Sequence, residues 1–185
     1  KALFLAEHMW FVEARQAGIM AGCIAREIEY SGQPVEPPVV LFSGGEMVVS
    51  VGEEKGIGGR NQEYALSAAQ IISGSKNIII GSVDTDGTDG PGAQFGEALD
   101  GIPSCLAGGV VDGNTVIEAE LAGIDIAEEL KRHNTSPALW KLGAGVHAVP
   151  GISIMDLTAV MVTGKSSQKQ SITTFVAGSR KKRNK

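Results

Sequence analysis

Residues Glu54–Gly74, EKGIGGRNQEYALSAAQIISG, run from a glycine-rich loop into an apolar, alanine-rich segment that predicts a helix at Asn61–Ser73. The run NIIIGSVD at 77–84 follows at once, and its continuous apolar character is typical of a strand buried on both faces. A loop, a helix and a buried strand in this order are typical of an α/β domain. This stretch therefore predicts the fold class.

The flanking segments continue the alternation of strands and helices in both directions. Apolar residues at helical spacing predict helices, and β-branched runs predict strands. The expected strands are Ala2–Leu5, Val39–Phe42, Met47–Val51, 145–150 and 156–162, and the expected helices are Val12–Tyr30, Asn61–Ser73, Asn114–Ala122, Asp125–His133 and one or two turns within 135–142. The sequence thus predicts an α/β layered domain with a mixed or largely parallel sheet flanked by helices.

The central loop has the composition of an anion site. A helix start offers unpaired N–H donors and the positive end of the helix dipole, and Gly58 and Gly59 allow a ligand to approach the backbone. Arg60 adds a planar fork suited to phosphate, and its place in a loop predicts an exposed side chain. Neither a dinucleotide fingerprint nor a Walker A loop fits, because Asn61 and Ala159 stand where each requires glycine. An ordinary glycine-rich loop before a buried helix is the alternative.

Length and composition bound the class of protein. The 185 residues suffice for one domain, and 43% hydrophobic with 5% aromatic residues predicts an aliphatic core. Two cysteines without a CxxC pair argue against structural zinc and a disulfide scaffold, which favours a cytoplasmic protein. No apolar run approaches a membrane span. The opening KALFLAEHMW lacks an initiator Met and starts mid-pattern, so we expect a fragment.

Charge is unevenly distributed along the chain. The net charge is −5, yet residues 165–185 hold seven Lys and Arg and no Asp or Glu. Such an end is typical of a solvated, flexible tail, and nucleic-acid binding is the less favoured alternative.

A second candidate site follows the predicted buried strand. The motif VDTDGTDG places Asp84, Asp86 and Asp89 just beyond the strand end, where ligands bind in open α/β sheets. Carboxylates there suit Mg²⁺ held together with phosphate oxygens. The alternative is a turn, because Asp-Gly pairs are common turn formers. Glu46 and Asp156 are further candidate acids, with a hairpin tip and a strand-entry turn as their structural alternatives.

Together these motifs resemble a known family. SGGE, GGRNQEYAL, TDGTDGP, GGVVDG and DLT, in this order, are similar to the C-terminal MOFRL domain of the glycerate 2-kinase family, and VEARQAG resembles the segment that precedes it. The resemblance covers roughly residues 10–162, and GGRNQE with TDGTDGP carries most of its specificity. Hydroxypyruvate reductase is a rival name used within this family.

The resemblance implies a two-domain kinase that transfers the γ-phosphoryl group of ATP to the 2-hydroxyl of glycerate with Mg²⁺, in a cleft between a larger N-terminal domain of the same chain and the MOFRL domain. It divides this chain into the end of a preceding domain or connecting helix (1–35), a MOFRL-like domain (36–164) and a basic tail (165–185). It implies a small-molecule hydroxy acid and a nucleotide as ligands, and a homodimer is a further expectation. The implied site residues are Arg60 for catalysis, Ser43, Gly44, Gly45, Glu46, Gly58, Gly59, Asn61, Gln62, Thr85 and Gly87 for substrate or phosphate, and Asp86 and Asp89 for metal.

The chain departs from the family pattern in its site loops. Asp84 replaces a glycine, residues 92–107 contain an insertion, HNTSP stands at 133–137 for NDSY, and GISIMDL stands at 151–157 for GTNVNDL. These changes favour a related hydroxy acid as a second candidate acceptor. Two other classes also stay open: a hydride-transfer enzyme, which would need a dinucleotide loop that this stretch lacks, and a non-catalytic α/β binding module.

Overall fold

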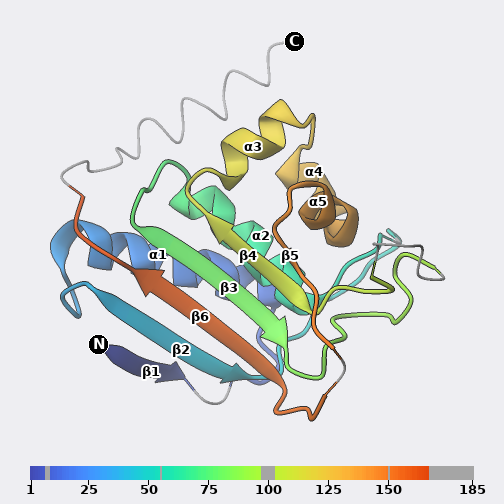
Figure 1. Ribbon diagram of the computed structural model, residues 1–185, viewed down its shortest axis with the longest axis horizontal. Coiled ribbons are helices and arrows are strands. Elements are labelled where there is room, and N and C mark those ends of the chain that lie inside the picture. Colours follow the sequence, from blue (N-terminus) through green and yellow to red (C-terminus); the bar gives the residue numbers. More distant parts are fainter. Residues whose placement is uncertain (7–8, 55, 97–102, 150, 167–185) are drawn as a thin grey trace.

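The computed structural model describes residues 1–6, 9–54, 56–96, 103–149 and 151–166. Within these ranges one sheet has the strand order β1-β2-β6-β3-β4-β5 (Figure 1). The strands are β1 Ala2–Ala6, β2 Val39–Gly45, β3 Ile78–Asp84, β4 Gly108–Asp112, β5 Gly145–Val146 and β6 Asp156–Val162, and the helices are α1 Ala14–Ser31, α2 Arg60–Ile72, α3 Thr115–Leu121, α4 Ile126–Lys131 and α5 Thr135–Lys141. Only the β1–β2 pair is parallel among these strands. The α/β prediction is confirmed in its mixed form, and the largely parallel alternative is wrong.

The helices cover one face of the sheet (Figure 1). Along β3, Ile78 and Ile80 are buried whereas Ile79 between them is exposed, and the same alternation runs through β2 and β6. Successive side chains of a strand point to opposite faces, so the buried set faces the helices. The prediction that 77–84 is buried on both faces is therefore wrong for the described part of the chain.

Helix α2 lies at the centre of the core and explains the alanine-rich sequence. It contacts α1, β3 and β4, and Ala65, Ala68 and Ala69 have no exposed surface. Small side chains let the helix approach its neighbours closely. The approach is closest at Gly18 of α1, where a Cβ atom would lie 2.1 Å from the carbonyl oxygen of Tyr64.

Two sequence predictions about strands are wrong. The strand expected at Met47–Val51 forms only an isolated bridge between Val48 and Glu13, because its backbone bonds to the start of α1 and to the Asp156 carboxylate. Strand β4, in contrast, is absent from the strands expected from the sequence. Gly108 allows this pairing, since a Cβ there would lie 1.9 Å from the Ser82 carbonyl oxygen.

The N-terminal segment belongs to the same layered structure. β1 pairs with β2, and α1 packs against α2, so residues 2–6 and 14–31 share the sheet and the core with the rest of the described chain. The predicted basic tail lies outside the described residues from position 167 onward; before it, Lys165 Nζ lies 2.7 Å from Glu36 Oε2. Among the described helices, none is both long and apolar enough to cross a membrane.

Candidate functional site

The start of β6 and the ends of its two neighbours, β2 and β3, lie side by side and form the base of the candidate site. The antiparallel register pairs Asp156, at the start of β6, with Gly45 at the end of β2 and with Asp84 at the end of β3. Side chains at paired positions lie on the same face, so the two carboxylates are neighbours on the helix face. Helix α2 begins with Arg60 on that same face.

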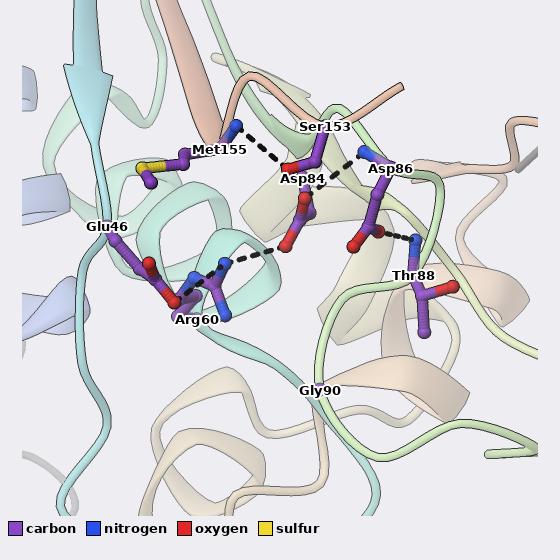
Figure 2. Close-up of a pocket in the computed structure, with 8 residues that line it drawn as sticks. All are labelled: Glu46, Arg60, Asp84, Asp86, Thr88, Gly90, Ser153 and Met155. Carbon is purple, nitrogen blue, oxygen red and sulfur yellow. Dashed lines mark hydrogen bonds and ion pairs between the residues drawn. The ribbon is translucent and has the colours of Figure 1, made fainter. Parts of the chain in front are cut away.

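Arg60 binds both carboxylates. Its Nε lies 2.9 Å from each oxygen of Asp156, and its Nη2 donates to Asp84 Oδ2 at 2.6 Å. Glu46 Oε1 lies 3.8 Å from Nη2, and Figure 2 shows Arg60 between Glu46 and Asp84. Only 21% of the Arg60 side chain is exposed. The expectation of an exposed loop arginine is therefore wrong.

The ion pairs keep Arg60 charged. Burial lowers the pKa of Arg60, but the hydrogen bond to Asp156 and the negative charges of Asp156 and Asp84 outweigh it, so the net shift of this pKa is upward. Burial raises the pKa of Asp84, and the Asp86 N–H and the Arg60 charge oppose this effect only in part. The guanidinium is thus a fixed positive charge whose orientation two buried acids determine.

A polar cavity of about 470 Å³ opens above this ion-pair group. Four of the candidates from the sequence line it, namely Glu46, Arg60, Asp84 and Asp86, and Figure 2 shows them around one space. The other lining residues are Thr88, Gly90, Ser153 and Met155. With three carboxylates and one guanidinium at its wall, the cavity has an excess of negative charge that a cation would neutralise.

Asp86 belongs to a tight turn at the cavity wall. Its Oδ1 accepts the backbone N–H of Thr88 at 2.7 Å, and its own N–H donates to Asp84 Oδ1 at 3.2 Å. The turn needs Gly87, whose φ of 92° is unfavourable for other residues. The sequence predictions of a turn and of a cavity acid are therefore compatible here.

Asp89 lies beneath the cavity and caps helix α2. It is fully buried, and its Oδ1 and Oδ2 accept the backbone N–H groups of Asn61 and Gln62 at 3.1 and 3.0 Å. Burial raises the pKa of Asp89 to about 6, although the hydrogen bonds from Asn61 and Gln62 act to lower this pKa. The helix N-terminus that the sequence suggested for an external anion is thus occupied by the chain's own carboxylate. Its position gives Asp89 a structural role and leaves Asp86 as the cavity acid of the pair.

Asn61 and Gln62 connect the site to the core and do not line the cavity. Asn61 Nδ2 donates to Asp156 Oδ1 at 2.7 Å and to Asp89 Oδ1 at 3.1 Å. Gln62 Oε1 accepts from Ser136 Oγ at 2.6 Å. Both side chains are fully buried, so they position the site acids and helix α2.

The loop glycines serve close packing. A Cβ at Gly59 would lie 2.4 Å from the Asp89 carboxyl carbon, and a Cβ at Gly58 would lie 2.4 Å from Thr135 Oγ1. Gly45, with a φ of 132°, leaves room for the backbone of Met9 in the same way. At these positions glycine lets two segments of the chain approach one another. The sequence had instead suggested that glycine is needed for the approach of a ligand.

The remaining predicted site residues support the walls of the site. Thr85 Oγ1 donates to the Met155 carbonyl at 2.8 Å and accepts from Ile154 N–H at 2.7 Å, which holds the 151–155 loop at the cavity. Ser43 is buried within β2, and the Gly44 carbonyl accepts the N–H of Met9 at 3.0 Å.

Sequence reasoning did not foresee that Asp84 and Asp156 bind Arg60. Both were noted as acids next to predicted strands. Asp84 and Asp156 lie 24 and 96 residues from Arg60 in the chain, however, and no local sequence pattern indicates that they contact it. Ser153 and Met155 were not candidates, and no local motif marks them. Among the described residues, no group of three or more His, Cys, Asp or Glu side chains forms a metal cage.

The chain is similar over most of its length to several known proteins. The chain is 42% identical over 154 residues to a glycerate 2-kinase of Pyrococcus horikoshii, covering 83% of this chain and 32% of that protein. It is 35% identical over 153 residues to a putative hydroxypyruvate reductase of Agrobacterium vitis, covering 81% of this chain and 32% of that protein. The crystal structure of glycerate kinase from Thermotoga maritima superposes with a TM-score of 0.78 at 36% identity, covering 88% of this chain and 36% of that one.

The chain thus spans about a third of the length of the relatives it matches. The sequence pattern described as MOFRL family matches residues 39–158, which is more than half of the chain. The match includes the strand β2, the helix α2 with Arg60, the Asp-Gly turn and the start of β6 with Asp156. The family predicted from the sequence motifs is confirmed: this chain belongs to the MOFRL family.

Proposed function

We propose that this chain is the C-terminal part of an ATP-dependent kinase that phosphorylates the 2-hydroxyl of glycerate or a related hydroxy acid. The active site would lie in a cleft shared with an N-terminal domain of the same parent chain, in the cytoplasm. Support comes from relatives named glycerate 2-kinase and from the one-third of their length that the chain spans. The observation that carries the proposal is the preorganised Arg60 at the wall of a polar cavity.

Arg60 is suited to stabilising the charge of a phosphoryl group during its transfer, because the side chain is oriented before a ligand binds. Phosphoryl transfer depends mainly on positioning and on stabilising charge at the phosphoryl oxygens. The ion pairs use Nε and Nη2, and Nη1 has no hydrogen-bond partner within the part of the chain that the structure describes. In this proposal Nη1 donates to a phosphoryl oxygen, while Asp156 and Asp84 hold the guanidinium plane.

The donor set at the cavity fits Mg²⁺. This ion is usually bound through one or two carboxylates together with substrate phosphates, so a full protein cage is not required. Asp86 lines the cavity and would hold the ion, with Asp84 beside it. Asp89 does not fit this role, since its oxygens accept N–H bonds from helix α2. When bound, Mg²⁺ would neutralise charge on the phosphate oxygens.

A coupled assay on the longer parent polypeptide tests the proposal. We expect glycerate-dependent ADP formation, and we expect Arg60→Ala to lower kcat by about a hundredfold or more, the usual effect of removing a preorganised donor. Arg60→Lys should restore only part of this, because an ammonium cannot reproduce the fork. The 185-residue chain alone should not phosphorylate glycerate.

Arg15→Ala is the matched control for this assay. Arg15 also pairs with a buried acid, Glu63 at 3.1 Å, and it does not line the cavity. Its removal should lower stability without changing the kcat of the folded enzyme. A kcat of Arg60→Ala within a few-fold of the Arg15→Ala value would contradict the catalytic role of Arg60.

Hydroxypyruvate reduction is the second candidate, because two relatives carry that putative name. The glycine loop of this chain lacks a dinucleotide fingerprint, so the rest of the parent would have to supply one. NADH or NADPH oxidation with hydroxypyruvate, in the absence of ATP, would support the reductase over the kinase. A lack of both activities would favour the non-catalytic binding module.

A further inference from the structure

The sheet has one face that no described helix covers. We call it the open face, and we define it by six residues that share the side opposite the helices: Phe4, Phe42, Ile79, Val110, Leu157 and Met161. Figure 1 shows this side of the sheet in front of the helices. Ile79 and Val110 are 38% and 42% exposed, and Phe4 is 74% exposed.

The composition of the open face is unusual for a surface in water. Antiparallel sheets with one solvated face normally alternate apolar and polar residues. On the open-face positions of β2, β3, β4 and β6, every residue is apolar or glycine except Asp112. This explains why NIIIGSVD predicted burial on both faces. The pattern is that of a sheet with a second covering layer.

Strand β1 adds a second, independent observation. It lies at the end of the strand order and pairs only with β2 among the described strands. Leu3 precedes Phe4 and lies on the opposite side of the strand, yet it is 42% exposed, and Leu5 is 48% exposed. An apolar edge strand exposed on both faces is a site for pairing or aggregation unless something covers it.

The exposed apolar surface also reaches the cavity. Ile152 and Ile154 are 89% and 71% exposed, and they flank Ser153, which lines the cavity. Thr85 holds this loop in place through its hydrogen bonds to Met155 and Ile154. A partner that covers the open face and this loop would therefore also border the site.

We propose that the open face, together with β1, is the docking surface for the part of the parent polypeptide that lies outside this chain. This inference rests on the proposed function, in which the site is completed by another domain. The relatives are about three times as long as the matched region, so two-thirds of each relative must be accommodated beside it. That length favours a covalently linked domain over a second copy.

The size of the open face agrees with an interdomain contact. The five strands that contribute to the open face lie about 4.8 Å apart and hold up to seven residues at about 3.3 Å each, which gives an area on the order of 500 Å². A typical stable interface buries about 800 Å² on each partner, so the open face supplies a large part of such an area. The largest apolar patch of a typical monomer covers about 300–600 Å², so the open face lies in the upper part of that range.

Hydroxyl-radical footprinting read by mass spectrometry tests this inference without substrate or nucleotide. The 185-residue chain is compared with the longer parent polypeptide. We expect the labelling of Phe4, Leu157 and Met161 to fall by about tenfold in the parent, because interface cores pack like protein interiors. Leu121 and Trp140, exposed on α3 and α5, are internal controls and should label equally in both.

Three outcomes would overturn the inference. Equal labelling of the open face in both proteins would show that the parent leaves it uncovered. Protection of the 185-residue chain that rises with concentration, with sedimentation as a dimer, would assign the face to a second copy. A gene that encodes no longer polypeptide would remove the proposed occupant.

The footprint and the kinase assay can fail separately. Arg60→Ala in the parent should lower kcat by about a hundredfold or more and leave the open-face protection unchanged. An active kinase with an unprotected open face would refute the docking inference alone. A protected open face in a parent without kinase or reductase activity would refute the proposed function alone.

Discussion

At the scale of single residues, Arg60 contributes to stability as well as to the proposed chemistry. Asp84 and Asp156 are buried, and Arg60 compensates their charge. Removing one partner of a buried ion pair leaves uncompensated charge, so we expect Arg60→Ala to lower the free energy of unfolding by about 3 kcal/mol. Chemical denaturation of the 185-residue chain measures this.

A matched set of variants separates charge from packing in this prediction. Converting Asp84 and Asp156 to asparagine in the Arg60→Ala background removes the buried negative charge, and it should recover part of the lost stability. If Arg60→Ala alone changes the unfolding free energy by less than about 0.5 kcal/mol, as most surface substitutions do, the ion pairs do not stabilise the fold.

Asp89 should make stability depend on pH. Burial raises its pKa from 3.8 to about 6, so the folded state holds this proton more tightly than the unfolded state. Its contribution to stability is therefore largest below pH 3.8 and falls as the pH rises to about 6, by up to about 1.4 kcal/mol per pH unit. Denaturation of the wild type and Asp89→Asn at several pH values isolates this slope. If the unfolding free energy of the wild type instead rises relative to that of Asp89→Asn as the pH increases, the N–H bonds lower the pKa of Asp89 more than burial raises it.

At the scale of the elements, the contact between α1 and α2 depends on glycine. Alanine is normally a better helix former than glycine by about 1 kcal/mol. At Gly18, however, a Cβ would lie 2.1 Å from the Tyr64 carbonyl oxygen, and backbone atoms cannot move aside without separating the helices. We expect Gly18→Ala to destabilise the fold by about 1–3 kcal/mol, the usual cost of overpacking.

Gln16→Ala, an exposed position of the same helix, is the control for this change and should be neutral. Thermal unfolding of both variants decides the sign. A higher melting temperature for Gly18→Ala would mean that helix propensity outweighs the contact and that α1 and α2 are less tightly packed than described.

Most elements could be predicted because their signals are local. The helix at α2 follows from its apolar and alanine-rich sequence, and its predicted start differs from the observed one by a single residue. Strand β4 was missed because GGVVD resembles loop sequence, and its glycines are suited to a strand only beside the β3 backbone. The segment 47–51 has strand-like residues, but its hydrogen bonds go to α1 and Asp156, so β-propensity was overridden by tertiary contacts.

At the scale of the whole molecule, the strand order predicts which parts open first. β6 is paired along its full length with β2 and with β3, whereas β1 lies at the edge. Native-state hydrogen exchange should therefore be slowest in β6 and fastest in β1, by about three orders of magnitude, since local opening energies range from near zero to that of global unfolding. Comparable protection of β1 and β6 in the isolated chain would show that another copy covers the edge.

The sequence by itself determined the alternation of helices and strands, the MOFRL family and the two motifs that reach the site. These follow from periodicity, propensity and short motifs, which act between residues close in the chain. Only the tertiary structure decided that Arg60 pairs with acids 24 and 96 residues away, that Asp89 caps α2, and that one sheet face stays open. The physical reason is strand register, which brings distant carboxylates together where three strands end. The described helices all pack on one side, so none of them covers the opposite face.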